Sequence, residues 1–221
     1  GKAYYHDYFG ELRQVRLRSY CQDKAVIKET LEKDVRRVRG KFPALTFEIP
    51  AFDRKGFARA MQAYTRLNNR VFSGHRYYYP RSEEEDLELF RSMKPLLKPE
   101  NLIFAELNGE AVGYILWYPD FNELVKPGKT PGIDTFLRYK VLRQVPSVGK
   151  VVEIALEKKY ERTGLIALLF WEALKSSHDR CDKVISSWVL EENLSSSLAV
   201  RRYANQTYKE FAAYEKDIIL L

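Results

Sequence analysis

The sequence predicts an α/β protein built on a mixed sheet with helices on both of its faces. Three observations support this fold class. From residue 44 onward, segments with the apolar spacing of strands and of helices follow one another in the order β, α, α, β, β, α, β, α, β, α, β. The dipeptide Asn108-Gly109 separates two apolar runs, as in a hairpin. The 221 residues are 45% hydrophobic and 30% charged, the composition of a globular chain with a sizeable core.

The first forty residues predict a strand and a helix that precede a main domain at residues 41–221. Val15 and Leu17 alternate with arginines, as in a half-buried edge strand. From residue 24 onward, apolar side chains recur every three or four positions, with Asp23 as the N-cap and Gly40 as the C-terminal stop of a helix. We therefore expect residues 1–40 to be a strand-helix extension.

The main domain opens with a short strand at residues 44–50 and an amphipathic helix at residues 56–72. The next nine residues, SGHRYYYPR, break the helical spacing and form an aromatic loop that could close over a substrate, stack on bases or anchor the core. Ser82 and Glu85 form a capping box that starts another helix.

The hairpin around Asn108-Gly109 requires a type I′ turn, because both central residues take positive φ. A long excursion at residues 121–148 follows, with a helix in its second half. The remaining predicted elements are a strand at 151–156, a helix at 165–175, a strand at 183–190, a helix at 193–203 and a final strand at 207–218.

Charge and cysteine usage limit the possible partners. The net charge of +7 and the pI of about 9.2 would suit nucleic acid or a phosphorylated cofactor. However, the basic residues follow strand and helix spacing, which favours solvated faces over a nucleic-acid groove. No apolar run reaches the roughly 20 residues of a membrane span, and Cys21 and Cys181 stand far apart. We expect a cytoplasmic protein without a membrane partner.

The candidate functional stretch is KVVEIALEKKYERTGLIALLFWEAL, residues 150–174. A strand leads through a charged turn into a helix, where free backbone amides and the helix dipole favour an anion. Thr163 can cap the helix, Gly164 removes a side chain that would block a phosphate, and Arg162 adds a cation. Alternatively, the segment is an ordinary strand-to-helix joint, and one glycine by itself favours this second interpretation. The histidines and cysteines lack metal-ligand spacing, so no metal is expected.

The segment YERTGLIALL resembles the (Arg/Gln)-x-x-Gly-x-(Gly/Ala) signature of the GNAT superfamily of acyl-CoA-dependent N-acyltransferases. Glu161, Gly164 and Ile166 stand at its three defining places. Residues 187–218 and the WYPDFNELV segment are similar to the C-terminal lobe of large, uncharacterised bacterial GNAT-like proteins. The opening YYHDYFGELRQVRLRSYCQD resembles the end of a preceding lobe, whose loss would leave an unpaired strand and a possible homodimer. The resemblance implies a GNAT-like mixed, mostly antiparallel twisted sheet.

A GNAT fold also implies a V-shaped gap between the strands at 151–156 and 183–190, which holds acetyl-CoA or another acyl-CoA. Strand backbone would pair with the pantetheine arm, and turn amides would hold the pyrophosphate. The cofactor-binding residues expected from the resemblance are Ile154, Leu156, Arg162, Thr163, Gly164, Leu165, Ile166, Ala167 and Asn193. The family's acid tyrosine falls on Val200, and Tyr203 and Tyr208 are out of register.

Glu153 is a charged residue within an apolar strand and is the candidate general base, if a bulge or the strand's alternation points it into the gap. Otherwise it is an edge-facing or salt-bridged glutamate. The expected substrate-binding residues are Trp117, Asp120, Asn122 and Glu191. We expect transfer of an acetyl or other acyl group to a primary amine. Two alternatives stay open: a catalytically degenerate GNAT-fold binding module and a basic nucleic-acid-binding protein.

Overall fold

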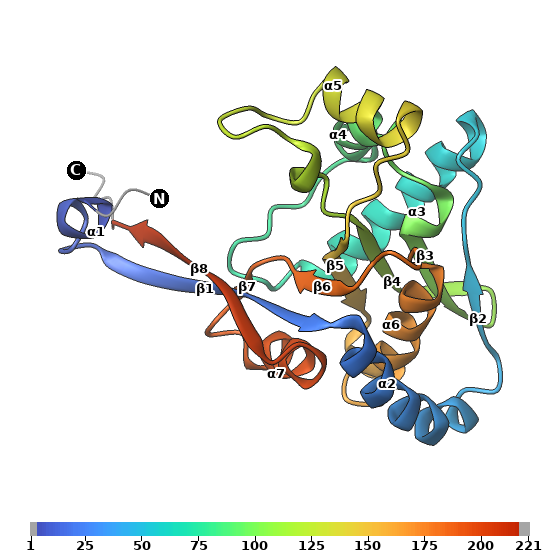
Figure 1. The fold of residues 1–221 in the computed structure, drawn as a ribbon. Coiled ribbons are helices and arrows are strands. Elements are labelled where there is room, and N and C mark those ends of the chain that lie inside the picture. Colours follow the sequence, from blue (N-terminus) through green and yellow to red (C-terminus); the bar gives the residue numbers. More distant parts are fainter. Residues whose placement is uncertain (1–3, 217–221) are drawn as a thin grey trace.

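The computed structural model describes residues 4–216, which form a sheet with helices packed on both faces (Figure 1). The strands are β1 (Arg13–Asp23), β2 (Leu45–Glu48), β3 (Leu102–Leu107), β4 (Glu110–Pro119), β5 (Val148–Leu156), β6 (Lys183–Ser186), β7 (Val189–Leu190) and β8 (Gln206–Glu215). The helices are α1 (Tyr4–Tyr8), α2 (Lys24–Val38), α3 (Arg54–Phe72), α4 (Glu83–Met93), α5 (Ile133–Phe136), α6 (Leu165–Ser176) and α7 (Leu194–Tyr203).

The strand order is β2-β3-β4-β5-β6-β1-β7, and β8 pairs with β1 outside this path. Every paired neighbour is antiparallel except β5 and β6, which run parallel. The sequence-based prediction of a mixed, mostly antiparallel sheet is therefore confirmed. Within residues 4–216, none of the helices combines the length and the apolar character needed to cross a bilayer.

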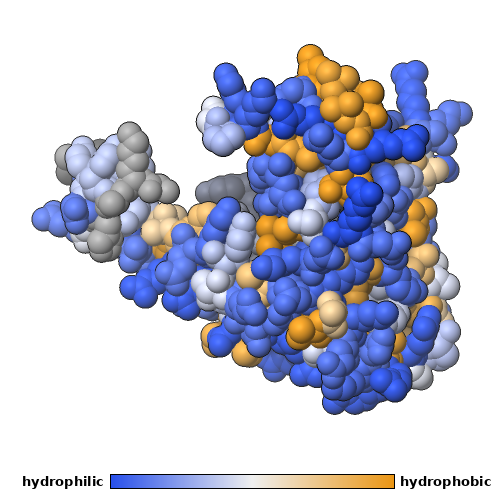
Figure 2. All heavy atoms as spheres, viewed as in Figure 1, coloured by the Kyte–Doolittle hydropathy of each residue, from blue (hydrophilic) through white to orange (hydrophobic). Residues whose placement is uncertain are grey.

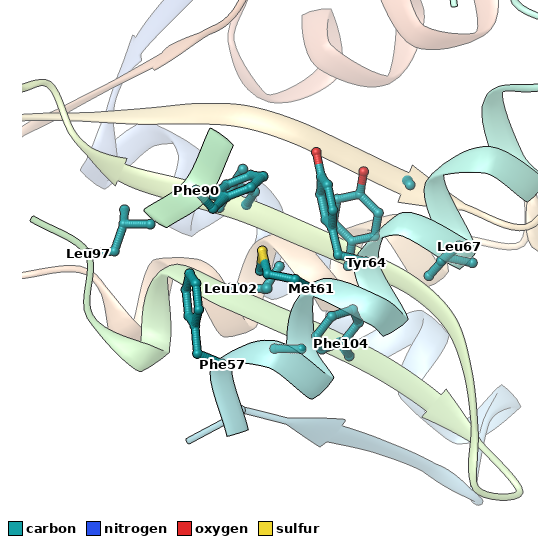
Figure 3. Packing of buried hydrophobic residues seen from close by; sticks show 12 residues of the cluster. Phe57, Met61, Tyr64, Leu67, Phe90, Leu97, Leu102 and Phe104 are labelled. Carbon is teal, nitrogen blue, oxygen red and sulfur yellow. The ribbon is translucent and has the colours of Figure 1, made fainter. Parts of the chain in front are cut away.

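Strands β3 and β4 are buried on both faces of the sheet, because alternate side chains face different helices. Leu102 and Phe104 pack with α3 and α4, in the cluster that Figure 3 shows around Met61 and Tyr64. Their neighbour Ile103 faces α6 on the opposite side. Two-sided burial explains why these strands read as continuous apolar runs.

The hairpin turn and the capping box of α4 are as predicted, whereas the predicted N-cap of α2 is not. Asn108 and Gly109 have φ values of 54° and 79°, the type I′ turn expected between β3 and β4. Ser82 Oγ accepts from the Glu85 amide, and the Glu85 carboxylate accepts from the Ser82 amide, which completes the capping box of α4. Asp23 precedes α2 but makes no side-chain cap.

The prediction that β1 is an edge strand is wrong. Cys21 pairs with Ile185 of β6 on one side and with Gln206 of β8 on the other. The alternation of apolar residues and arginines in β1 therefore does not reflect exposure at an edge. Arg18, for example, lies 3.1 Å from both Glu191 and Glu210, whose charges neutralise its guanidinium. The free edge on which a homodimer was predicted is consequently occupied. The division of the chain at residue 40 stays a prediction.

Beyond the body of the sheet, β1 and β8 continue as a two-stranded arm with α1 at its tip (Figure 1). The Phe9 ring lies 5.2 Å from the Tyr214 ring and fastens the tip to β8. At the other end of β1, helix α2 packs on α6 through Val35, Val38 and Leu168. Residues 13–38 are thus part of the same sheet and core as the rest.

Candidate functional site

A gap opens between β5 and β6, at the place where the GNAT resemblance implies one. The two strands pair from Val148 opposite Lys183 to Val151 opposite Ser186, and the Ser187 amide makes a last bond of 2.8 Å to the Val151 carbonyl. The chain then leaves for β7, which pairs with β1. Residues 152–156 of β5 therefore have no strand on that side.

A cavity of about 490 Å³ occupies this gap. Its apolar end is lined by side chains from α2, α6 and β6, among them Ile27, Leu31, Phe170, Leu174 and Val184. Its polar end is formed by β5 and by the loop between α3 and α4, with His75, Tyr77, Tyr78, Arg81 and Glu153. Since α2 and α6 cover one face of the sheet and α3 the other, the cavity passes through the gap.

Glu153 sits at the polar end because of a bulge in β5. Leu116 of β4 pairs with Glu153, whereas the next residue, Trp117, pairs with Val151, so Val152 is an extra residue in the strand. Val152 packs into the α3-side cluster, and the Glu153 carboxylate also reaches a side chain of α3. The bulge therefore directs two successive side chains to one face.

Two tyrosines hold the Glu153 carboxylate. Tyr64 donates a hydrogen bond of 2.7 Å to Oε2, and Tyr114 donates one of 2.6 Å to Oε1. Burial, together with the charge of Glu153, raises the pKa of both phenols well above their ordinary range. Both hydroxyls consequently remain protonated donors, and Glu153 remains the acceptor. Figure 3 shows the Tyr64 hydroxyl pointing out of the apolar cluster.

The ion pair between Arg81 and Asp86 contacts Tyr64 and so supports the position of the Tyr64 hydroxyl. Arg81 Nη2 lies 3.4 Å from the Tyr64 hydroxyl, and Arg81 Nε lies 2.7 Å from Asp86 Oδ1. Asp86 is fully buried and accepts a hydrogen bond of 2.8 Å from Thr65. The carboxylate at the cavity is therefore connected to a buried, charged network that restricts its position.

The aromatic loop spans the polar end of the cavity. His75, Tyr77 and Tyr78 line it, and Asn69 of α3 donates to the Arg81 carbonyl at 2.8 Å. On the far side, Arg76 pairs with Glu215 of β8 at 2.7 Å. Tyr77 also donates to Glu215. The loop is a strap from α3 to β8.

The turn expected to hold pyrophosphate lies outside the cavity lining. Gly164 has a φ of 92°, and a Cβ built on it would lie 2.6 Å from Val38 Cγ2 of α2. Its lack of a side chain is thus required by helix packing, and open access for a phosphate does not explain it. Leu165 and Ala167 are buried in the core, whereas Arg162 and Glu161 are exposed.

Some anion-binding capacity remains at this turn. The Thr163 amide bonds to the Tyr160 carbonyl, and the Leu165 amide lies 3.4 Å from Thr163 Oγ1. Among the described residues, the amides of Gly164 and Ile166 have no protein acceptor. A surface turn with two free amides fits a phosphate, so the assignment of residues 162–167 stays a prediction.

The other predicted cofactor residues divide between cavity and core. Ile154 and Asn193 line the cavity, and Asn193 Oδ1 also accepts from the Ser196 amide at 3.1 Å, which caps α7. Leu156 packs into the α6-side cluster and does not reach the cavity.

Of the predicted substrate residues, only Trp117 lines the cavity, and its Nε1 donates to the Glu100 carbonyl at 2.8 Å. The Asp120 carboxylate accepts from the Asn122 side chain at 2.7 Å in a turn away from the cavity. Glu191 is paired with Arg18. The structure therefore does not bring Asp120, Asn122 and Glu191 to the cavity.

No acid for a leaving group is found in the expected place. Val200 lines the cavity where the family tyrosine would stand. Tyr203 is close, but its hydroxyl donates to Asp34 of α2 at 2.9 Å. Asp34 also accepts two bonds of 2.6 Å from Arg202. In residues 4–216, no group of three or more His, Cys, Asp or Glu side chains is placed to hold a metal ion.

The fold class is that of the GNAT superfamily. A solved structure of a fungal β-N-acetylglucosaminidase with a GCN5-related glucosamine N-acetyltransferase region is similar to this protein, with a TM-score of 0.54 and 12% identity. The match covers 94% of this chain and 22% of the fungal chain. A conserved Bacteroides thetaiotaomicron protein of unknown function matches 97% of this chain and 66% of its own, with a TM-score of 0.56 and 10% identity.

Two curated proteins are similar in sequence. The bacterial ceramide synthase of Caulobacter vibrioides is 24% identical over 192 residues, which cover 83% of this chain and 50% of that protein. Protein YghO of Escherichia coli is 26% identical over 179 residues, which cover 77% of this chain and 46% of that protein. This chain thus spans about half the length of the curated relatives it matches. No protein-family model matches it.

Proposed function

We propose that this protein is an acyl-CoA-dependent N-acyltransferase that acylates a primary amine. The main support is the position of Glu153: a carboxylate held by two tyrosines at the point where β5 loses its strand partner and a cavity begins. A carboxylate in this position can accept a proton from an ammonium that enters from the strap side.

In the proposed reaction, acyl-CoA supplies an activated thioester. The unpaired edge of residues 152–156 would bind its pantetheine arm, and the free amides at the Gly164 turn would hold its pyrophosphate. Glu153 accepts a proton from the acceptor's ammonium, and the amine attacks the carbonyl carbon. The C–N bond forms as the C–S bond breaks, and the second proton that the nitrogen loses as it becomes an amide passes, directly or through water, to the CoA thiolate.

The apolar end of the cavity favours a substrate with a long aliphatic chain over one with acetyl alone. Ile27, Leu31 and Phe170 line this end, and an alkyl chain placed there would leave water. The name of the Caulobacter relative points to the same class, since a ceramide is the N-acyl derivative of a long-chain amine. We therefore place a long-chain acyl group or a long-chain amine at the apolar end.

Two measurements test this function. Calorimetry with acetyl-CoA, palmitoyl-CoA and desulfo-CoA measures binding, and thiol release over a panel of short and long-chain amines measures transfer. We expect tighter binding of palmitoyl-CoA and thiol release only with amines. Failure of every CoA species to bind at millimolar concentration would exclude the acyltransferase. Binding without thiol release would instead support a degenerate binding module with a GNAT fold.

A further inference from the structure

The excursion between β4 and β5 ends in a helical segment with one buried and one exposed apolar face. On the buried face, Tyr139 packs its ring 5.0 Å from Phe121, and the Thr135 side chain is completely covered. Arg138 Nη1 donates to the Leu124 carbonyl at 3.1 Å. The segment, α5 followed by a π-helical turn (Leu137–Val141), is therefore fastened to the body of the protein.

The opposite face exposes four aliphatic side chains within ten residues. Ile133 is 80% exposed, Leu137 46%, Val141 62% and Leu142 63%. Figure 2 shows an apolar patch at the top of the molecule, over the position of α5 in Figure 1, with hydrophilic residues around it. Ile133, Leu137 and Val141 are four residues apart and so share one side of the helical segment, and Leu142 directly follows Val141. The four side chains therefore form one apolar patch rather than scattered exposures. We refer to these four residues as the α5 patch.

The charge around the α5 patch is strongly positive. Residues 125–147 contain five basic side chains and one acidic one, Asp134, which gives this segment a net charge of +4. The basic residues are Lys126, Lys129, Arg138, Lys140 and Arg143. Burial and the neighbouring Lys98 lower the pKa of Lys140, and Glu100 opposes them. The net charge per residue is therefore higher in this segment, with +4 in 23 residues, than in the whole chain, with +7 in 221 residues.

We infer that the α5 patch docks on the surface of an anionic phospholipid bilayer. Aliphatic side chains that project from a short helical segment enter the interface between headgroups and acyl chains. The exposed basic residues around them, Lys126, Lys129, Lys140 and Arg143, contact the phosphates. A protein partner fits less well, since the centres of protein interfaces are enriched in aromatic residues and depleted in lysine. Surface docking needs no spanning helix. It is independent of the proposed acyl transfer.

Co-sedimentation with vesicles tests this inference. One set contains phosphatidylcholine alone, and the other contains equal parts of phosphatidylcholine and phosphatidylglycerol. We expect the protein to bind the anionic vesicles and to be released by added salt. The double variant Leu137→Ser/Val141→Ser should lose at least roughly tenfold in partitioning, because it removes two inserted side chains. Circular dichroism confirms that this variant is folded.

A matched control uses exposed aliphatic residues elsewhere. Val26 and Leu89 are 46% and 53% exposed on α2 and α4, so Val26→Ser/Leu89→Ser should bind vesicles as the unchanged protein does. Equal binding by the patch variant and the control, or no binding of anionic vesicles at low salt, overturns the inference. A second result would also overturn it: the unchanged protein does not bind vesicles, and sedimentation equilibrium shows that it forms a dimer which the patch variant does not form.

Discussion

Tyr64 of α3 donates a hydrogen bond of 2.7 Å to Glu153 of β5, although the two residues are 89 positions apart. Tyr114 makes the matching bond of 2.6 Å to the other carboxylate oxygen. A carboxylate that accepts a hydrogen bond at each of its oxygens is held in one orientation beside the cavity. This arrangement supports the proposed role of Glu153 as a base, since a surface glutamate would lack two buried donors.

Replacement of Glu153 should remove transfer but preserve donor binding. We expect Glu153→Gln to lower kcat/KM for amines by roughly a hundredfold or more, because the amide cannot accept the proton. Affinity for palmitoyl-CoA, measured by calorimetry, should stay unchanged. Glu88→Gln, an exposed glutamate on α4, is the matched control. Normal turnover by Glu153→Gln would show that another group acts as the base.

The role of Tyr64 can be separated from that of Glu153 by a double-mutant cycle. Tyr64→Phe alone should reduce kcat, since the carboxylate loses one of its two donors. In the Glu153→Gln background the same change should have little further effect on kcat, because the residue acts through Glu153. Additive losses in the cycle would mean that the tyrosine contacts the substrate itself.

The elements of the fold could be predicted because their signals are local. The Asn108-Gly109 turn and the Ser82 capping box are set by residues within four positions of each other. Strand partners are not local, because β1 pairs with residues 160 or more positions away. Its arginines are typical of a solvent-exposed edge strand, and only the tertiary structure places Glu191 and Glu210 beside Arg18.

Prediction of the candidate site is limited in the same way, because its contacts join residues that are distant in sequence. Glu153 could be identified because a charge within an apolar strand is unusual. Its partners Tyr64 and Tyr114 stand at apolar positions of a helix and of a strand, and core aromatics have the same spacing. The bulge at Val152 cannot be predicted from alternation, yet it decides which face Glu153 takes. The sequence resemblance favours a phosphate-access role for Gly164, whereas its contact with Val38 of α2 depends on tertiary packing.

Gly164→Ala should destabilise the protein for two reasons. A φ of 92° is unfavourable for alanine by about 1–2 kcal/mol, and the new Cβ would lie 2.6 Å from Val38 Cγ2. In the Val38→Ala background the clash is removed and only the backbone cost remains, so urea unfolding should show a smaller loss there. An equal loss in both backgrounds would mean that α2 does not pack on this turn.

The strap over the cavity should open when its contact with β8 is removed. Arg76 pairs with Glu215, and Tyr77 donates to the same carboxylate, so Glu215→Gln weakens both contacts. We expect trypsin to cleave after Arg76 several times faster, because local opening exposes the loop. Glu210→Gln, on the same strand but paired with Arg18, should leave the cleavage rate unchanged. Equal rates for the two variants would show that the loop is held by other contacts.

Asp34 should make stability depend on acid pH. Its hydrogen bonds with Arg202 and, less strongly, with Tyr203 and Arg37 lower its pKa from 3.8 to about 2, against the opposing effect of burial. A carboxyl with a lowered folded-state pKa stabilises above its unfolded pKa, and this contribution is lost as the pH falls from 3.8 toward 2. Asp34→Asn should therefore cost about 2 kcal/mol in urea unfolding at neutral pH and flatten the acid limb. The exposed Asp179→Asn should do neither, and an unchanged acid limb in Asp34→Asn would refute the assignment.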